Sequence, residues 1–487
     1  MIEIYVKIDS IDVDMAIKNI QKLLEEDKTI SNSLKAAISV LLILVKILID
    51  RLGLNSKNSS KPPSTDDKFK KNLKKKNNSS MNSRGGQNGH TGTTLKPVDL
   101  PDKIEIIAID RSLLPKGRYK LMGYEKRQVI DIQFSRVVTE YQAQILEDQL
   151  GNQFIAPFPE GVIRPVQYGS SVKAHAVYLS QFQLIPFERI QSQFFDQYNI
   201  PLSTGSLYNF NRDAYDRLLD FEKVAKHELI HADLVHADET GINIDGKQAW
   251  LHNASNDKWT LFFPHLKRGC EAMVTMGIFP FFLGILCHDH WKPYFKYLCT
   301  HALCNAHHLR ELLRAYEQDA QQWAEKMRRL LLEINDDVEK NGGVLSIKVS
   351  NKWREKYRAI LLEADIECPP PDEQKKKKRG RLKRTKSRNL LERLRGYEND
   401  VLRFMDVIYV PFTNNQGERD IRMTKVQQKI SGCFRSMEGA ETFCRVRSYL
   451  LTCQKNSIGA VEALELLFNG SLPDFIQEKI KSIPLNI

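Results

Sequence analysis

Three acidic residues, Asp238, Asp289 and Glu418, lie where their carboxylates are expected to meet. Asp238 ends a mainly apolar run that begins at residue 229, and Asp289 ends a second run that begins at residue 281. Glu418 lies near the start of a helical pattern that follows a polar loop. Carboxylates at adjacent strand ends, completed by a glutamate from a helix, can bind hard divalent cations. A pair of such ions activates a nucleophile and stabilises charge on phosphoryl oxygens, so these residues predict phosphodiester chemistry.

Neighbouring acids compete for the same roles. Glu239 is next to Asp238, and Asp420 is two residues after Glu418. An aspartate at the end of a strand is more often a turn or capping residue than a metal ligand. The residue pattern alone therefore leaves the choice of ligands open.

A second set of metal-ligand residue types lies between residues 287 and 308. Cysteine and histidine suit Zn²⁺, but the spacing is not that of a known zinc ribbon, and we do not expect zinc. We expect His307 and His308 to be helix residues near the active site or structural residues. A zinc hydrolase is the alternative that metal analysis would test. The set consists of Cys287, His288, His290, Cys304, His307 and His308.

Hydrophobic spacing predicts the elements that position the carboxylates. Asp245-Gly246 predicts a hairpin turn, and residues 270–276 predict a short helix. The order of a β-meander, a helix and another strand is that of the first elements of an RNase-H-like fold, although other mixed folds share this order. The sequence does not locate the fifth strand of such a sheet. The strand candidates are residues 229–237, 248–253, 259–264 and 281–288.

Helices are expected both before and after these strands in the sequence. Upstream, three short helices fit a helix-turn-helix unit or any small helical bundle, and Ser203 or Thr204 is expected to cap the third. Downstream, the segments are largely helical, and the last of them carries Glu418. The upstream helices are residues 172–182, 187–195 and 206–219; the downstream ones are residues 301–366, 389–405 and 416–429.

The N-terminal part is expected to be helical over residues 12–54, with an apolar stripe that fits either a helical dimer contact or packing within the chain. Its most apolar part, residues 36–49, is too short to span a bilayer and contains Lys46. Apolar-rich runs in residues 99–160 indicate a small β-rich module.

Positive charge is concentrated in two segments. Residues 55–90 contain nine Lys or Arg and two Asp, whereas residues 374–388 contain ten Lys or Arg and no acid. The whole chain has a net charge of +12, so the remainder is close to neutral. Basic segments of this kind suit a polyanion because each cation near a phosphate releases condensed counterions. A solvated linker with no partner is the alternative interpretation.

All eight cysteines lie in the second half of the chain, without a regular framework. Together with the lack of a recognisable signal peptide, this indicates reduced thiols and a cytoplasmic, nucleoid-associated protein with no membrane partner.

Three long motifs make the sequence similar to a known family. They are HADET at residues 236–240, CHDHWKPY at 287–294 and TNNQGERDIR at 413–422. These closely resemble the catalytic blocks of the insertion sequence 66 transposase family. The helix after the second block, residues 302–312, and the linker motifs at residues 58–66 and 85–90 extend the resemblance, which runs from about residue 50 to residue 465.

The resemblance implies a DDE transposase in which Asp238, Asp289 and Glu418 form the catalytic triad. It implies metal-dependent cleavage at transposon ends, with Mg²⁺ or Mn²⁺ as two ions, followed by strand transfer into target DNA. The expected partners are DNA, further copies of the chain on DNA, and small accessory proteins of the same element. The candidate DNA-binding residues are Lys375, Lys376, Lys377, Lys378, Arg379, Arg381, Arg419 and Arg422.

The expected fold is a multidomain α/β chain with an RNase-H-like core interrupted by a helical insertion, preceded by helical and β-rich modules. The expected divisions are a helical segment (1–54), a basic linker (55–98), the β-rich module (99–160), a helix-turn-helix-like region (161–227), the catalytic domain (228–470, insertion about 300–405) and a tail (471–487).

One departure from the family bears on function. The family commonly has a cysteine-rich, zinc-binding segment after the linker, but residues 102–120 contain neither cysteine nor histidine. A catalytically decayed or repurposed DNA-binding protein of the same fold is therefore the alternative to an active enzyme. The intact acidic motifs favour activity.

Overall fold

The computed structural model describes residues 7–8, 11–27, 29–52, 54–55, 57–59, 95–371 and 384–483. Most of the expected basic linker lies outside these residues, and so do the candidate DNA-binding residues from Lys375 to Arg381. Within the described part, no helix combines the length and apolar character needed to cross a membrane.

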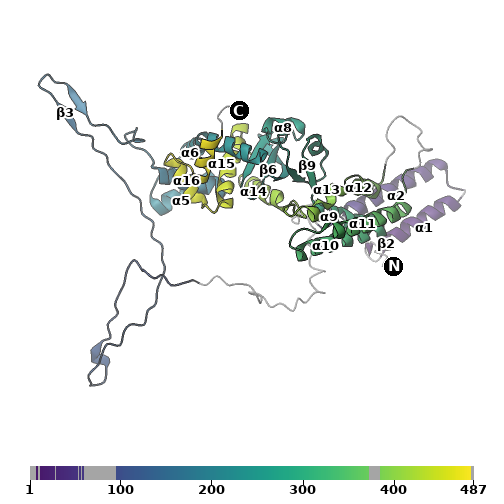
Figure 1. Ribbon diagram of the computed structural model, residues 1–487, viewed down its shortest axis with the longest axis horizontal. Helices are drawn as coiled ribbons and strands as arrows, with labels where there is room; N and C mark the ends of the chain where they lie inside the picture. The colour runs from purple at the N-terminus through teal and green to yellow at the C-terminus, as the bar shows by residue number, and fades with distance from the viewer. Residues whose placement is uncertain are drawn as a thin grey trace.

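A five-stranded mixed sheet lies at the centre of the molecule (Figure 1). Its order is β7-β6-β5-β8-β9. β6 is antiparallel to both of its neighbours, whereas β8 is parallel to β5 and β9 is parallel to β8. The strands are β5 (Leu234–Ile244), β6 (Lys247–Ser255), β7 (Thr260–His265), β8 (Ile285–His288) and β9 (Thr300–Leu303).

The first three strands form the expected meander. Asp245 and Gly246 have φ values of 49° and 74°, which a tight hairpin turn between twisted strands requires, so the predicted turn is confirmed. The short helix between β7 and β8 is confirmed as α8 (Cys270–Met276).

Several predicted elements differ in the structure. Of the strand predicted at residues 281–288, only Ile285–His288 forms β8, and the helix predicted at residues 389–405 is divided into two. Residues 229–237 are not one strand, because α7 (Leu219–Ile230) continues its buried spacing through Leu229 before β5 begins at Leu234. The helical prediction for residues 301–366 is also wrong at its start. Residues 300–303 form β9, the fifth strand, and Ala302 and Leu303 are buried in the sheet.

The parallel half of the sheet separates two hydrophobic cores. Leu286 packs in one core with α7 and the C-terminal helices, whereas Ile285 and Cys287 pack in the other with the helical insertion. This alternation follows from the two-residue repeat of a strand. Strand β8 is therefore buried on both faces, as its continuous apolar sequence requires.

The second core belongs to the insertion, which separates β9 from α14 (Asn415–Ser431). The insertion begins after β9, so its start is later than the expected residue 300. Its helices are α9 (Asn305–Asp319), α10 (Gln322–Lys340), α11 (Ile347–Glu367), α12 (Lys386–Gly396) and α13 (Glu398–Asp406).

The three predicted upstream helices are present, and Ser203 caps the third by accepting a hydrogen bond from the Ser206 N–H. The first begins as an α-helix and ends in a π-helical turn. These helices share one core with α15 and α16, so they form part of a helical bundle. The elements are α4 (Ser170–Val177), η3 (Tyr178–Phe182), α5 (Phe187–Tyr198), α6 (Thr204–Arg217), α15 (Met437–Lys455) and α16 (Ala460–Phe468).

The chain differs from expectation in two further places. The expected C-terminal tail contains α17 (Asp474–Ser482), whose Ile476 is fully buried and which packs on α7. Residues 95–168 do not form a packed β-rich module. In Figure 1 the chain around β3 (Ile145–Glu147) extends away from the helices and the sheet. β3 pairs with β4 (Gln153–Ile155) as one hairpin, and most apolar side chains of residues 95–168 are exposed.

The N-terminal helical prediction is confirmed as two helices, α1 (Val13–Glu26) and α2 (Asn32–Leu52), joined by a turn. A two-residue strand pair, β1 (Lys7–Ile8) with β2 (Ile11–Asp12), precedes them. Asn58, shortly after α2, donates a hydrogen bond to Glu317 of α9 at 3.0 Å. This contact links the N-terminal part to the insertion.

Candidate functional site

Asp238 and Asp289 occupy equivalent positions relative to the pairing of two neighbouring parallel strands, β5 and β8. The last parallel pair between β5 and β8 is His236 with Cys287, and each aspartate lies two residues beyond it. The sequence predicts Asp238 at the end of a strand, but in the structure β5 continues beyond it, paired with β6. It lies where the parallel ladder stops, and this brings the two carboxylates to the same edge.

The third carboxylate, Glu418, is brought to this edge by the first turn of α14. Asn414, the residue before the helix, is 2% exposed and connects the helix to β5. Its side-chain N–H donates to the Ala237 carbonyl at 2.8 Å, and its Oδ1 accepts from His236 Nδ1 at 2.7 Å. The two β5 residues that Asn414 contacts are the two immediately before Asp238, so this contact sets the position of Glu418 relative to Asp238.

Gly417 completes this attachment because the helix approaches the strand closely. Its carbonyl accepts a hydrogen bond from Asn253 of β6 at 3.1 Å. A Cβ atom at position 417 would lie 3.1 Å from both polar side-chain atoms of Asn414. Glycine therefore allows Asn414 to keep its two hydrogen bonds to β5.

Asp238 is surrounded by other carboxylates. Burial raises the pKa of Asp238 well above its usual value, and the nearby charges of Glu239, Asp289 and Glu418 raise it further. Burial also raises the pKa of Asp289, whereas a hydrogen bond from the Trp291 N–H at 2.9 Å opposes this shift. The site therefore gathers negative charge that favours a cation.

The two competing acids are neutralised by side chains of the protein. The side chain of Glu239 is 2% exposed and accepts two hydrogen bonds from Arg268, at 3.0 and 2.6 Å, and one from the Tyr294 hydroxyl at 2.6 Å. Asp420 forms a 2.7 Å ion pair with Lys455. Among the described residues, Asp238 and Asp289 form no ion pair.

Arg268 is itself held between two aromatic rings. Its guanidinium carbon lies 4.7 Å from the ring centroid of Trp250 and 4.3 Å from that of Trp291. Cation–π contacts of this kind orient the guanidinium. The Trp291 N–H also donates to Asp289, so the Arg268 cluster joins Glu239 of β5 to the segment that carries Asp289.

The donor set fits hard divalent cations. All three triad residues offer carboxylate oxygens, which Mg²⁺ prefers. One oxygen of Glu418, Oε1, is buried and has no hydrogen-bond partner among the described residues. Arg310 forms a long ion pair with this oxygen at 3.7 Å, and His307 Nδ1 also lies 3.7 Å away; both distances are beyond a hydrogen bond. A buried carboxylate oxygen without a hydrogen-bond partner is costly, and a bound cation would satisfy it.

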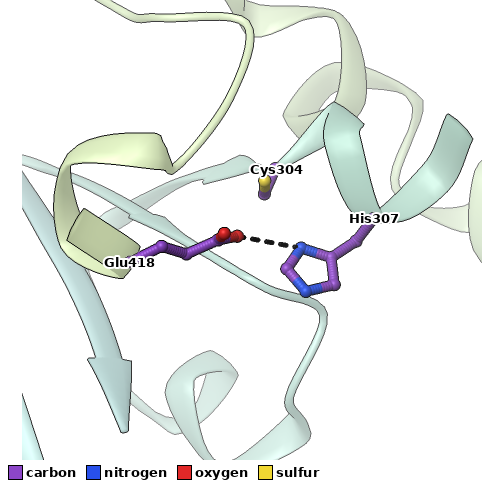
Figure 2. Close-up of side chains that lie close together, drawn as sticks. All are labelled: Cys304, His307 and Glu418. Carbon is purple, nitrogen blue, oxygen red and sulfur yellow. Dashed lines mark ion pairs between the residues drawn. The ribbon is translucent and has the colours of Figure 1, made fainter. Parts of the chain in front are cut away.

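The six cysteines and histidines considered as a second metal set do not gather. Cys287 is buried in a hydrophobic core, His288 pairs with His301 at 3.1 Å, and His308 pairs with Asn305 at 3.0 Å. His290 packs edge-on against Tyr397. The remaining two, Cys304 and His307, lie beside Glu418 (Figure 2).

The candidate DNA-binding residues that the structure describes lie on α14. Arg419 and Arg422 are exposed and three residues apart, so they share one side of the helix that carries Glu418. Arg388, at the end of the second basic segment, has a different role. Its side chain is 6% exposed and pairs with Asp365 at 2.6 Å and with Glu392.

Sequence reasoning misses Asn414, Arg268 and Lys455. In the sequence Asn414 is only part of a polar loop, although an Asn-Asn pair shortly before a catalytic candidate is a usable signal. The ion pairs of Arg268 and Lys455 join residues 29 and 35 positions apart in sequence, and no local pattern predicts them.

Comparison with known families agrees with this arrangement. The model of a family of unknown function (DUF6444) matches residues 8–96. No curated protein matches the chain. The model of the transposase IS66 family matches residues 165–442, which is more than half of the chain and includes Asp238, Asp289, Asn414 and Glu418. The chain that places these carboxylates at one sheet edge therefore belongs to the transposase IS66 family.

Proposed function

We propose that this protein is a DDE transposase in which Asp238, Asp289 and Glu418 hold two divalent cations, Mg²⁺ or Mn²⁺. Family membership gives it a role in transposition and an interaction with DNA. The finer proposal is cleavage of strands at transposon ends and their transfer into target DNA. The observation that carries it is the shared register of Asp238 and Asp289 beyond the last parallel pair, with Glu418 attached to the same point of β5 through Asn414.

The sheet order supports an RNase-H-like catalytic core. In order of sequence, the five strands are arranged 3-2-1-4-5, and only the second is antiparallel to the rest. The first aspartate is on the first strand, the second follows the fourth strand, and the glutamate is on a later helix that crosses the sheet. This is the arrangement expected of the family's catalytic domain.

The roles of the residues follow from their chemistry. When bound, the cation pair would activate the attacking hydroxyl and stabilise charge on the phosphoryl oxygens. Asp238, Asp289 and Glu418 supply the oxygen ligands, and Asn414 fixes the third relative to the first. Glu239 and Asp420 do not compete, because Arg268 and Lys455 neutralise them.

Arg419 and Arg422 are placed to contact the DNA backbone near the reacting phosphate. Both are exposed on α14, and arginine matches the geometry of a phosphate group. The segment from Lys375 to Arg381 is proposed as a second, sequence-independent DNA contact. Further copies of the chain on DNA and accessory proteins of the same element remain proposed partners.

The alternative is a DNA-binding protein of this fold that no longer cuts. The specific observation in its favour is residues 95–168, which lack the family's zinc ligands over residues 102–120 and form no packed module among the described residues. The complete and mutually oriented triad favours the active enzyme.

The proposal is tested with a labelled DNA duplex that carries the ends of the element, incubated with Mg²⁺. Cleavage by the wild-type protein that falls at least about 10³-fold in Asp238→Asn and Asp289→Asn supports it, since loss of a ligand removes several kcal/mol of transition-state stabilisation. Asp102→Asn, in an exposed segment, is the matched control. Undiminished cleavage by either triad variant would contradict the assignment.

A further inference from the structure

A second group of possible ligands shares Glu418 with the proposed catalytic site. The sulfur of Cys304, a ring nitrogen of His307 and a carboxylate oxygen of Glu418 all lie within 4.8 Å of one another (Figure 2). These residues come from the first turns of two helices, α9 and α14. None of the roles described above uses Cys304 or His307.

The local fold directs both residues of α9 to one side. Cys304 is the capping residue of α9, and His307 lies three residues later, with its N–H bonded to the Cys304 carbonyl at 3.2 Å. Residues three apart at the start of a helix are neighbours on its surface. The backbone N–H of Asn414 donates to the Cys304 sulfur at 3.1 Å, so the loop before α14 holds the thiol against the Glu418 helix.

Two of the candidate ligand atoms lack hydrogen-bond partners. His307 Nδ1 and Glu418 Oε1 are both buried, and neither makes a hydrogen bond among the described residues. They face each other at 3.7 Å. Ligands about 2.0–2.3 Å from a tetrahedral Zn²⁺ lie roughly 3.3–3.8 Å apart, so this separation already suits a metal ion.

The electrostatic setting favours a neutral imidazole. Burial and the nearby charges of Arg310 and Arg393 lower the pKa of His307 to about 4. Burial raises the pKa of the Cys304 thiol to about 11, so metal binding at this site releases a proton.

We propose that Cys304, His307 and Glu418 form a binding site for a thiophilic divalent cation such as Zn²⁺. A cysteine, a histidine and a carboxylate are a borderline-soft set that Mg²⁺ does not favour. The three ligands leave one tetrahedral position open. An ion bound here withdraws Glu418 from the two aspartates, so Zn²⁺ inhibits strand cleavage; this second part rests on the proposed function.

Co²⁺ tests the binding site directly, because its coordination by a thiolate gives an absorption band that needs neither DNA nor catalysis. We expect the full-length protein to give a saturable sulfur-to-cobalt band that Zn²⁺ abolishes. Cys304→Ser is expected to remove the band, and His307→Gln to weaken cobalt binding by at least about tenfold. Cys433→Ser, which changes an exposed free cysteine, is the matched control and should keep the band.

Further variants separate this site from the proposed catalytic function. Asp289→Asn should retain the cobalt band, whereas Glu418→Gln should weaken it. In wild-type protein, micromolar Zn²⁺ should inhibit Mg²⁺-dependent cleavage, and Cys304→Ser should relieve the inhibition. Absence of the band in wild-type protein, or its persistence in Cys304→Ser, would overturn the site. Absence of cleavage with the band intact would count against the proposed function alone.

Discussion

At the scale of single residues, the two competing acids differ from the two aspartates of the triad because each competing acid has a close cationic partner. Glu239 and Asp420 are as close in sequence to the triad as any acid in the chain, yet Arg268 and Lys455 neutralise them. Asp238 instead lies among other carboxylates, and its pKa is raised by burial and by their charges. An arrangement that disfavours its own charged form is expected where a cation is to bind.

This electrostatic cost predicts how metal-free protein responds to pH. The pKa of the Asp238 carboxyl is about 4 in the unfolded chain and higher in the folded protein. Its protonated form therefore favours folding at low pH, and this stabilisation is lost as the pH rises from about 4 through the higher folded-state pKa. Asp238→Asn removes the charge, so metal-free variant protein should melt about 2–4 °C higher than wild type at pH 8, which corresponds to about 1 kcal/mol in a domain of this size.

Thermal unfolding in the presence of EDTA, from pH 5 to pH 8, measures this effect. The difference between the two proteins should shrink toward pH 5, and Mg²⁺ should stabilise wild type more than the variant. A wild-type protein that is more stable than Asp238→Asn at pH 8 without metal would contradict the electrostatic account.

At the scale of elements, the site depends on how α14 is attached to β5. Asn414 makes its two side-chain hydrogen bonds to the residues before Asp238, and Gly417 leaves room for them. Asn414→Ala leaves the Ala237 carbonyl and His236 without these partners, which costs about 2–3 kcal/mol of stability. Strand cleavage should fall roughly 10–100-fold because Glu418 loses its support.

Cleavage rates and melting temperatures of matched variants test this attachment. Asn415→Ala changes the adjacent exposed asparagine and should alter neither quantity. Gly417→Ala should impair cleavage, since its Cβ would lie 3.1 Å from the Asn414 side chain. Equal effects of Asn414→Ala and Asn415→Ala would show that the contact to β5 does not position Glu418.

Much of the sheet can be predicted from the sequence because its signals are local. The Asp245-Gly246 turn, β6, β7 and α8 follow from turn chemistry and short-range spacing. The prediction for residues 229–237 fails because the buried spacing of α7 runs directly into the apolar start of β5. β9 has four residues between a loop and a long helix, too few for a strand pattern to emerge.

Motif resemblance specifies one candidate triad, whereas the residue pattern leaves the choice of ligands open. Position relative to strand ends is correct for Asp289 and inaccurate for Asp238, which lies inside β5. What makes Asp238 equivalent to Asp289 is the register between β5 and β8. Pairing between distant segments determines that register, so a single strand's sequence does not contain it.

At the scale of the whole molecule, the basic segment from Lys375 to Arg381 is expected to contribute affinity for DNA without sequence preference. Replacing its six Lys and Arg residues with Gln should weaken DNA binding and flatten its salt dependence, by about 0.9 in log–log slope for each phosphate that the segment no longer neutralises. Arg388 should be left unchanged, because it is buried in ion pairs within the insertion.

Fluorescence anisotropy of labelled duplex DNA across a salt series measures this slope. Neutralising a comparable number of exposed lysines and arginines in residues 95–168 is the control for net charge. An unchanged slope in the Lys375–Arg381 variant would exclude that segment from DNA binding.

The exposed apolar face of α2 in the N-terminal pair of helices predicts association between copies of the chain. Along α2, apolar side chains remain exposed, including Leu41 at 59%, Leu44 at 51% and Leu48 at 59%. These three positions share one face, and an exposed apolar face of this extent marks an interaction site. The same face on a second copy would bury both in a symmetric contact.

Sedimentation velocity at micromolar concentration tests the association. Wild-type protein should be a dimer or larger, and simultaneous replacement of Leu41, Leu44 and Leu48 with Glu should yield monomer. The same three substitutions at exposed Leu95, Leu113 and Leu150 should leave the oligomeric state unchanged. A monomeric wild-type protein would contradict the prediction.

The central claim is that Glu418 completes a metal site with Asp238 and Asp289, and cleavage of element-end DNA by Glu418→Gln tests it most directly. The comparison is with wild type and with Asp420→Asn. Asp420 lies two residues from Glu418 on the same helix and forms an ion pair with Lys455. We expect Mg²⁺- or Mn²⁺-dependent cleavage by wild type, a loss of at least about 10³-fold in Glu418→Gln, and most of the activity retained in Asp420→Asn. Full activity in Glu418→Gln, or abolition in Asp420→Asn with the fold intact, would contradict it.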